Sequence, residues 1–391
     1  MKYRHHRGLT LSEIGVGGYA LSGAYGPVDR AGFTALVRRA HDLGVTFFDT
    51  AGNYGDAEEV LGEALRPFRD EVTLATKVGS PEGAAPSLAP DAVRAACRRS
   101  LQRLGTDHID LLQVHFDDPA TRVEDTVAAL EGLQQEGVIR RYGVGHLPAA
   151  RVARYLEVGR PFSLLMELSG VAREARRSLL PWCGGDGPAA IAFSVTGRGL
   201  LSGTIGPATA FEAGDIRHFD PLFQRARFAS GQRLAAHFAV LAHALGKTPA
   251  QAAIAWVLAQ PGVVCALTGP RRLAHLEENL GGSGWRLPPE ALDDLERRFA
   301  QEDATLAVEE GATVDAILDG PLPPDPAAAF RDLVYAIETA VTLGRATEDA
   351  VRPAFFDLWP LQEGLEGAGP ALEGIRAALR RVISPAVRPS G

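Results

Sequence analysis

The alternation of short apolar runs with helix-like segments is the feature that most constrains the fold of this chain. Eight apolar runs recur from the N-terminus to about residue 281, and amphipathic stretches such as 91–105 and 122–137 separate them. The runs are IGVGG (14–18), VTFFDT (45–50), VTLATK (72–77), IDLLQVH (109–115), IRRYGVG (139–145), FSLLMEL (162–168), AIAFSV (190–195) and VVCALT (263–268). Eight strands that alternate with helices predict a (β/α)8 barrel rather than a doubly wound sheet.

The glycine-rich stretch in the first run supports the barrel. An open dinucleotide-binding sheet begins with a GxGxxG turn after its first strand, and a helix follows that turn directly. GVGGYALSG at 15–23 lacks this spacing, and no helical segment follows promptly.

The pattern changes after the eighth run, and we expect two parts: a barrel over 1–301 and an all-helical extension over 302–391. The segment 287–303 has the pattern of one more surface helix, and the proline-rich DGPLPPDP at 319–326 interrupts the chain. Two amphipathic segments follow, with apolar stripes that must be buried. The stripes are Leu333, Ile337 and Val341, then Leu372, Ile375 and Leu379.

Three arrangements of the extension remain open. It could pack against the barrel and screen its mouth, with the aromatic AFFDLWP at 354–360 as anchor, or it could be a solubilising tail. It could also join two copies of the chain in a homo-oligomer.

Charge and composition exclude several classes of protein. A net charge of −8 argues against nucleic acid or an anionic membrane as the main partner. The N-terminus lacks the apolar core of a signal peptide, and AAIAWVLA at 252–259 is too short to cross a bilayer. The three cysteines lie far apart without a CxxC pair, so we expect neither a zinc site nor disulfides. These features predict a cytoplasmic protein without a bound metal.

Polar side chains follow three consecutive strand-like runs at the point where each run ends. Asp49, Lys77 and His115 end the second, third and fourth runs, and Tyr54 follows in the loop after the second. In a barrel, the loops at the carboxyl ends of the strands form the active site. Neighbouring strands lie about 4.8 Å apart, so these four side chains can converge.

The four residue types form a chemically sensible set. A tyrosine hydroxyl has a pKa near 10, and we expect the Lys77 ammonium to lower that of Tyr54. Asp49 would balance the buried charge of Lys77, and His115 could donate a hydrogen bond to a substrate carbonyl or pass a proton to Tyr54. No side chain supplies a hydride, so a nicotinamide cofactor is the obvious source.

Each residue also has an ordinary structural interpretation. Asp49 could cap a helix, His115 could be a satisfied buried histidine, and Lys77 could extend to the rim. Their joint occurrence on three consecutive strand ends favours a site.

The chain resembles the aldo-keto reductase family of NADPH-dependent barrel oxidoreductases. The resemblance covers residues 1 to about 285, and its most specific segment is FFDTAGNYGDAEEVLGEAL at 47–65. Further matches are LATK, LGTDHIDLLQVH, LEGLQQEGVIRRYGVG, GRGLLSG, KTPAQAAIAWVLAQPGV and GPRRLAHLEENL. The resemblance implies that Asp49, Tyr54, Lys77 and His115 form the catalytic tetrad, with Tyr54 as general acid and base.

The resemblance also implies a set of cofactor contacts, for NADPH or alternatively NADH. Arg271 or Arg272 could pair with a 2′-phosphate. Phe193 falls where the family often stacks an aromatic ring on the nicotinamide. The implied set is Gly17, Gly18, Tyr19, Asp49, Gly145, His146, Phe193, Leu200, Ser202, Gly269, Arg271, His275, Glu278 and Asn279.

Three departures from the family pattern concern the cofactor. Gly145 and His146 stand where the family usually has Ser-Asn, and Leu165 or Met166 stands where a glutamine is usual. Thr204 replaces the lysine that usually follows the GLLSG loop. The first two put the anchoring of the nicotinamide carboxamide in doubt, and the third removes a phosphate contact.

Three functions fit these residues. The first is NADPH-dependent, reversible reduction of an aldehyde or ketone, with a small carbonyl or alcohol compound as the substrate. The second is a regulatory or sensor subunit that binds cofactor with little turnover, which the altered carboxamide contacts favour. The third is a redox-neutral epimerisation that uses a tightly held nicotinamide.

Overall fold

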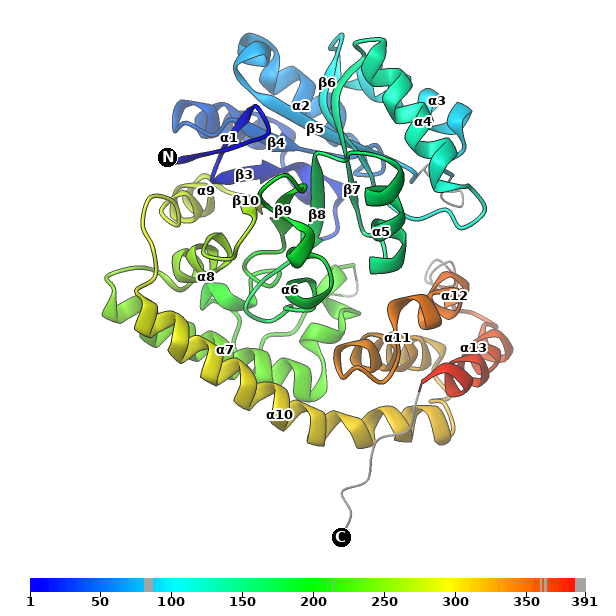
Figure 1. Ribbon diagram of the computed structural model, residues 1–391. Coiled ribbons are helices and arrows are strands. Elements are labelled where there is room, and N and C mark those ends of the chain that lie inside the picture. Colours follow the sequence, from blue (N-terminus) through cyan, green and yellow to red (C-terminus); the bar gives the residue numbers. More distant parts are fainter. Residues whose placement is uncertain (81–86, 213, 359–360, 362–363, 384–391) are drawn as a thin grey trace. The chain divides into compact units, whose positions relative to one another are not determined.

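The computed structural model describes residues 1–80, 87–212, 214–358, 361 and 364–383. Eight parallel strands close into a barrel in the order β10-β3-β4-β5-β6-β7-β8-β9 (Figure 1). They are β3 (Ile14–Gly17), β4 (Phe47–Asp49), β5 (Thr73–Val78), β6 (Ile109–Val114), β7 (Ile139–Gly145), β8 (Ser163–Glu167), β9 (Ala189–Phe193) and β10 (Val263–Thr268). The prediction of a (β/α)8 barrel is confirmed.

Amphipathic helices alternate with these strands. The stretches expected to be helical at 91–105 and 122–137 form α3 (Pro90–Leu104) and α4 (Val123–Gln135), and α4 buries Val123, Val127, Leu130 and Leu133 as its spacing predicts. The other helices in this part are α1 (Arg30–Asp42), α2 (Ala57–Leu65), α5 (Ala149–Val158), α6 (Ala175–Ser178), α8 (Pro249–Leu258) and α9 (Leu273–Leu280). They position the loops that follow each strand.

The interior of the barrel is filled with side chains. Phe47, Ala75, Leu111, Leu165, Ile191 and Cys265 belong to one buried cluster. A hairpin of β1 (Tyr3–His6) and β2 (Leu9–Ser12), which the sequence did not predict, adds Leu11 to this cluster. Arg4 of the hairpin donates to the carbonyls of Val263 and Leu258 and pairs with Glu13. The hairpin therefore completes the barrel core from the N-terminus.

The chain divides into two compact units. The barrel unit comprises 1–205 and 235–291, and the helical unit comprises 206–234 and 292–391. The helices α7 (Arg225–Ala244) and α10 (Pro289–Asp319) contribute residues to both. The boundary expected between residues 301 and 302 stays a prediction. In the structure, residues 206–234 and 292–301 belong with the C-terminal helices.

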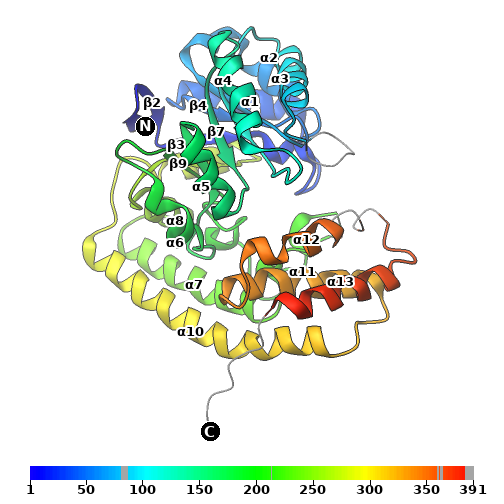
Figure 2. The ribbon, with the colours of Figure 1, turned by 45° about the vertical axis from the view of Figure 1, so that its right-hand side comes forward.

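The helical unit has an apolar core of its own. Besides α10 it contains α11 (Pro326–Thr342), α12 (Glu348–Leu358) and α13 (Gly369–Val382), which lie together in both ribbon views (Figure 2). The expected apolar stripes pack in one cluster, where Leu333, Ile337, Leu372, Ile375 and Leu379 are buried and Val341 is partly buried. Of the expected anchors, Trp359 and Pro360 lie outside the described residues. The position of this unit at the barrel mouth stays a prediction.

Ion pairs and hydrogen bonds tie residues 206–234 to α10 and α11. Glu302 accepts from Ser230 and Arg233, and Arg225 pairs with Asp332 at 2.5 Å. These contacts join segments that are far apart in sequence. Among the described residues, no helix combines the length and the apolar character that a membrane crossing requires.

Gly62 allows α2 and α3 to approach closely, and this contact can be tested. A Cβ at Gly62 would lie 2.1 Å from the carbonyl oxygen of Leu104, whereas one at Gly132 of α4 would meet only the flexible end of Arg94. We expect Gly62→Ala to lower the free energy of unfolding by about 1–3 kcal/mol, because backbone must move. The matched Gly132→Ala should be neutral or stabilising by up to about 1 kcal/mol. Urea unfolding measures both, and equal midpoints for the two variants would contradict the close approach.

Candidate functional site

The four polar residues expected at the strand ends meet at the carboxyl end of the barrel. Asp49 ends β4, Lys77 lies near the end of β5, and His115 directly follows β6. Tyr54 comes from the loop between β4 and α2. All four are buried, with Tyr54 the most exposed at 8%.

An ion pair between Asp49 and Lys77 lies at the base of this site. Lys77 Nζ lies 2.5 Å from Asp49 Oδ1 and donates to the carbonyl of Thr50 at 2.8 Å. The second carboxylate oxygen, Asp49 Oδ2, accepts from Gln113 Nε2 at 3.1 Å. Asp49 therefore ends a buried strand because its charge is needed by the lysine of the next strand.

Burial opposes both charges of this pair. Burial raises the pKa of Asp49, while Lys77 and the Gln113 hydrogen bond act to lower it. Burial likewise lowers the pKa of Lys77, and Asp49 acts to raise it. Each residue therefore keeps its charge only with the help of the other.

The Tyr54 hydroxyl lies beside His115 and Lys77. Its oxygen is 3.4 Å from His115 Nε2, and Lys77 Nζ lies 4.9 Å from the centre of the Tyr54 ring. Tyr19 packs edge-on against the same ring, with centroids 4.9 Å apart. These contacts bring the predicted tetrad into one small volume.

The pKa of Tyr54 differs from the sequence-based expectation. We expected Lys77 to lower it, but burial raises the pKa of the Tyr54 phenol well above its usual value, and Asp49, Tyr19 and Tyr25 add to the rise. The reason is that Asp49 balances the lysine charge, so the pair offers little net positive field against the cost of desolvating a phenolate. In this structure the hydroxyl is therefore firmly protonated.

His115 is neutral in the same surroundings. Burial lowers its pKa well below the usual value, and the nearby charges of Lys77 and His146 act in the same direction. Its buried Nδ1 has no hydrogen-bond partner among the described residues. A neutral imidazole can donate one hydrogen bond and accept another.

Aromatic rings extend the site from His115 to the end of β9. His146 packs edge-on against His115 at 5.3 Å and stacks on Phe193 at 4.8 Å with ring planes 19° apart. The His146 side chain is exposed and Phe193 is half-buried. His146 adopts φ 49°, a left-handed conformation in which histidine and asparagine are over-represented. The histidine thus fits the turn where the family pattern has asparagine.

A series of contacts through Tyr25 and Tyr19 connects Arg271 with Tyr54. Arg271 donates to the carbonyl of Tyr25 and lies 6.0 Å from the centre of that ring, and Tyr25 packs edge-on against Tyr19 at 5.9 Å. Tyr19 in turn contacts Tyr54. Arg271 and Arg272 also line a hollow of about 340 Å³ together with Pro27, Val28, Asp29, Gly32, Ala35 and Leu273.

The comparisons with known proteins identify the family. The aldo/keto reductase family model matches residues 13–298. Aldo-keto reductase YhdN of Bacillus subtilis is 33% identical over 298 residues, which cover 74% of this chain and 90% of the relative. Aldo-keto reductase str7 of Strobilurus tenacellus is 34% identical over 305 residues, with 75% and 90% covered. The chain belongs to the aldo-keto reductase family.

Solved structures give the same answer for the fold. The glycerol dehydrogenase AKR11B4 from Gluconobacter oxydans is 28% identical, with a TM-score of 0.71 over 77% of this chain and 95% of that chain. The holo form of aldo-keto reductase AKR11C1 from Bacillus halodurans is 25% identical, with a TM-score of 0.65 over 76% and 96%. This aldo-keto reductase is therefore an oxidoreductase built on a (β/α)8 barrel.

Two departures from the family pattern are linked in the structure. Leu165 belongs to the apolar interior of the barrel, so its side chain offers no hydrogen bond to a cofactor. A Cβ on Gly145 would lie 2.9 Å from Leu165 Cβ and 3.3 Å from its carbonyl oxygen. β7 and β8 are therefore too close at this point for a side chain at 145, and the serine that the family usually carries there would require the two strands to shift.

The remaining expected cofactor residues lie on glycine-rich loops and on α9. Gly17 pairs with Asp49 across β3 and β4, and Gly18 begins a short helix that carries Tyr19. Leu200 is buried, and Ser202 Oγ donates to the Gly199 carbonyl and lies 2.8 Å from the Thr204 hydroxyl. Gly269 faces open space. His275, Glu278 and Asn279 all lie on α9 (Leu273–Leu280).

The sequence did not single out two polar groups beside these residues. Gln113 donates to Asp49 from the middle of β6, and Glu167 at the end of β8 pairs with Arg198 at 3.0 Å. A buried polar residue two positions before His115 was the available signal for Gln113. Among the described residues, no cluster of three metal-binding side chains occurs.

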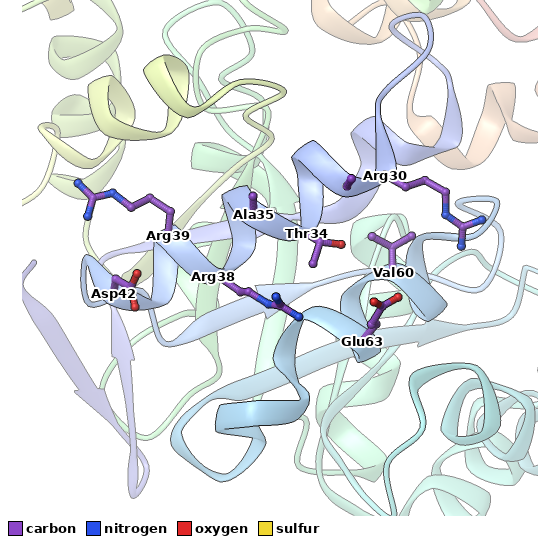
Figure 3. Close-up of a pocket in the computed structure, with 9 residues that line it drawn as sticks. Arg30, Thr34, Ala35, Arg38, Arg39, Asp42, Val60 and Glu63 are labelled. Atoms are coloured by element: carbon purple, nitrogen blue, oxygen red, sulfur yellow. The ribbon is translucent and has the colours of Figure 1, made fainter.

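A groove of about 610 Å³ lies away from this chemistry, on the outside of α1 and α2 (Figure 3). Its lining includes Arg30, Arg38, Arg39, Asp42 and Glu63. Arg30 pairs with Asp56, and Arg39 pairs with Glu277. None of the tetrad residues lines it.

Removal of Lys77 tests the electrostatic role of the ion pair. We expect Lys77→Met to lower the free energy of unfolding by about 3–5 kcal/mol near neutral pH, because it leaves the Asp49 carboxylate buried and unpaired. The loss should shrink as pH falls through the raised pKa of Asp49, since the protonated acid needs no partner. Urea unfolding at about pH 8 and about pH 5 measures this. Asp49→Asn added to Lys77→Met should recover part of the loss, and full additivity of the two changes would contradict the coupling.

Proposed function

We propose that this protein reduces an aldehyde or ketone to an alcohol with NADPH, by hydride transfer with Tyr54 as the proton donor. The observation that carries this proposal is the Tyr54 hydroxyl, which lies 3.4 Å from His115 Nε2 and beside the Asp49–Lys77 pair. A proton donor and a hydrogen-bond donor that converge at the carboxyl end of a barrel suit a carbonyl oxygen.

The residues at the barrel end fit a nicotinamide cofactor, which would supply the hydride. The stacked His146 and Phe193 offer a partly exposed aromatic surface beside His115, against which a planar nicotinamide ring could stack. Gly269 is open, and the arginines that follow it can pair with phosphate. A family relative solved in a holo form supports the same expectation. The carboxamide would depend on His146, since Gly145 and Leu165 provide no side-chain donor.

Three side chains of the protein have different roles at the substrate carbonyl. His115 donates a hydrogen bond to the carbonyl oxygen and fixes its position. Tyr54 donates its proton to the same oxygen as negative charge develops there. Lys77, held by Asp49, lies beside the ring and stabilises the phenolate that remains. Solvent then returns the proton to Tyr54.

The raised pKa of Tyr54 sets the pH dependence of each direction of the reaction. A phenol with a pKa well above 10 remains protonated throughout the neutral range, so it is ready to act as an acid in reduction. Oxidation of an alcohol needs the phenolate as a base, which is scarce under the same conditions. We therefore infer that the oxidation rate rises with pH above the neutral range.

Replacement of the proton donor is the direct test of this function. Tyr54→Phe should reduce carbonyl reduction by about 10²–10⁴-fold while the Kd for NADPH changes little, because the change removes only the hydroxyl. Tyr155→Phe is a matched control, since Tyr155 is also buried but lies on α5. NADPH consumption with a panel of aldehydes and ketones provides the rate. Undiminished reduction by Tyr54→Phe would exclude the tyrosine as the acid.

Tight binding of NADPH without NADPH consumption for any aldehyde or ketone of the panel would support the sensor function instead. The missing carboxamide donors at Gly145 and Leu165 are the observation in its favour.

The choice of cofactor can be tested at the two arginines. We expect NADPH to bind about 10–100-fold more tightly than NADH, since each charge-assisted hydrogen bond to the 2′-phosphate contributes about 1.5–3 kcal/mol. Arg272→Ala should weaken NADPH by about tenfold and leave NADH unchanged. Arg271→Ala should weaken NADPH as well and also disturb Tyr25, which it contacts. Fluorescence titration gives the dissociation constants of the wild type and both variants for each cofactor. Equal affinity of the wild type for both cofactors would show that the arginines do not bind phosphate.

A further inference from the structure

Gln113 occupies an unusual position for an amide side chain. It is completely buried within β6, in the barrel interior between Lys77 on β5 and Gly143 on β7. Both ends of its amide are used. Nε2 donates to Asp49 Oδ2 at 3.1 Å, and Oε1 accepts from the Ser163 hydroxyl at 3.3 Å. Burial of an amide costs free energy unless its polar atoms form hydrogen bonds, so the presence of Gln113 here depends on these two partners.

The orientation of the amide follows from its partners. A carboxylate has no proton to donate, so the NH₂ end must face Asp49. The Ser163 hydroxyl then supplies the proton that the carbonyl end needs. Ser163 lies two strands away, on β8, and it reaches Gln113 because the intervening residue is Gly143. A Cβ on Gly143 would lie 2.2 Å from Ser163 Oγ and 3.4 Å from Gln113 Cγ.

Lys77, Gln113, Gly143 and Ser163 are successive partners in the strand register from β5 to β8. A hydrogen-bonded series therefore runs from Ser163 through Gln113 and Asp49 to Lys77. Ser163 donates to Gln113, and Gln113 donates to Asp49. Lys77 donates to the same carboxylate from the other side. Four consecutive strands, β5 to β8, thus contribute to holding one carboxylate.

We propose that Gln113 is a positioning residue that keeps Asp49 ionised and correctly oriented toward Lys77. It does not touch the reacting atoms, and it acts through the carboxylate. Without its hydrogen bond, the buried carboxylate would keep only Lys77 as a donor, and its proton affinity would rise. The protonated Asp49 would then no longer stabilise the ammonium beside Tyr54. For catalysis, the inference rests on the proposed function.

Several ionisable groups face this carboxylate, and each has to be considered in a pH experiment. Lys77 pairs with Asp49 directly, and the charge of Asp49 acts on Tyr54 and on Cys265 of β10. The charge of Glu58 on α2 acts to raise the pKa of Lys77. The charge of Lys77 acts to lower the pKa of His115 and of His146. Burial and Asp49 raise the pKa of the Cys265 thiol and keep it neutral, and burial lowers the pKa of His115 well below its usual value. Asp49 is the ionisable group to which Gln113 donates, so it is the group whose protonation Gln113 controls.

The first test needs no substrate. Gln113→Met preserves the approximate volume of the side chain and removes its donor. Asp49 has a raised pKa in the folded protein, and loss of the donor raises it further. The destabilisation caused by Gln113→Met is therefore largest at about pH 8 and shrinks as pH falls through the folded pKa of Asp49. In Asp49→Asn, which has no carboxylate, the same Gln113→Met change should show no such pH dependence.

The second test compares two replacements in NADPH-dependent carbonyl reduction. Gln113→Met should lower the rate by about tenfold and move the acid limb of the pH–rate profile upward by about one unit, because one charge-assisted hydrogen bond is lost. Gln113→Glu places a second carboxyl beside Asp49. It can share one proton at low pH but repels Asp49 once both ionise, so activity should fall on the alkaline side instead.

The outcomes separate the inference from the proposed function. Opposite pH shifts for the two variants, with a pH-dependent loss of stability, support the positioning role. A loss of stability that is the same at every pH would show that Gln113 only packs, and would overturn it. If the wild type reduces no carbonyl compound, the proposed function fails, while the unfolding data still decide whether Gln113 keeps Asp49 ionised.

Discussion

The buried ion pair between Asp49 and Lys77 is the interaction on which the rest of the site depends. Its two partners come from neighbouring strands, so it can form only when β4 and β5 lie in the observed register. Neither charge would be stable alone at this depth. The hydrogen bonds from Gln113 and to Thr50 satisfy the remaining atoms of the pair. The charge state of the site therefore depends on the register of β4 and β5 in the closed barrel.

The pair also determines what Tyr54 can do. Because its charges nearly cancel, it does not acidify the tyrosine, and burial decides the pKa of the phenol. A lysine beside a tyrosine suggested the opposite from sequence alone. The sequence shows which residue types are near one another, but it does not show whether a charge is already balanced. That balance depends on distances of a few ångströms, which only the fold provides.

The barrel and the tetrad could be predicted because their signals are local. Each strand-like run is apolar up to one polar end, and Asp49, Lys77 and His115 stand at three of those ends. Gln113 could not be assigned a role, because its partner Ser163 lies fifty residues away. The helical unit was recognised by its apolar stripes, but its use of residues 206–234 depends on long-range pairs such as Arg225–Asp332.

The close approach of Gly145 and Leu165 restricts how this site can change. A side chain introduced at 145 would meet the Cβ and the carbonyl oxygen of Leu165. Alanine at 165 would keep both of these atoms, so a smaller side chain there would leave the contact in place and add a cavity to the barrel interior. The restriction therefore lies in the spacing of β7 and β8, and a side chain at 145 requires the backbone of these two strands to move apart.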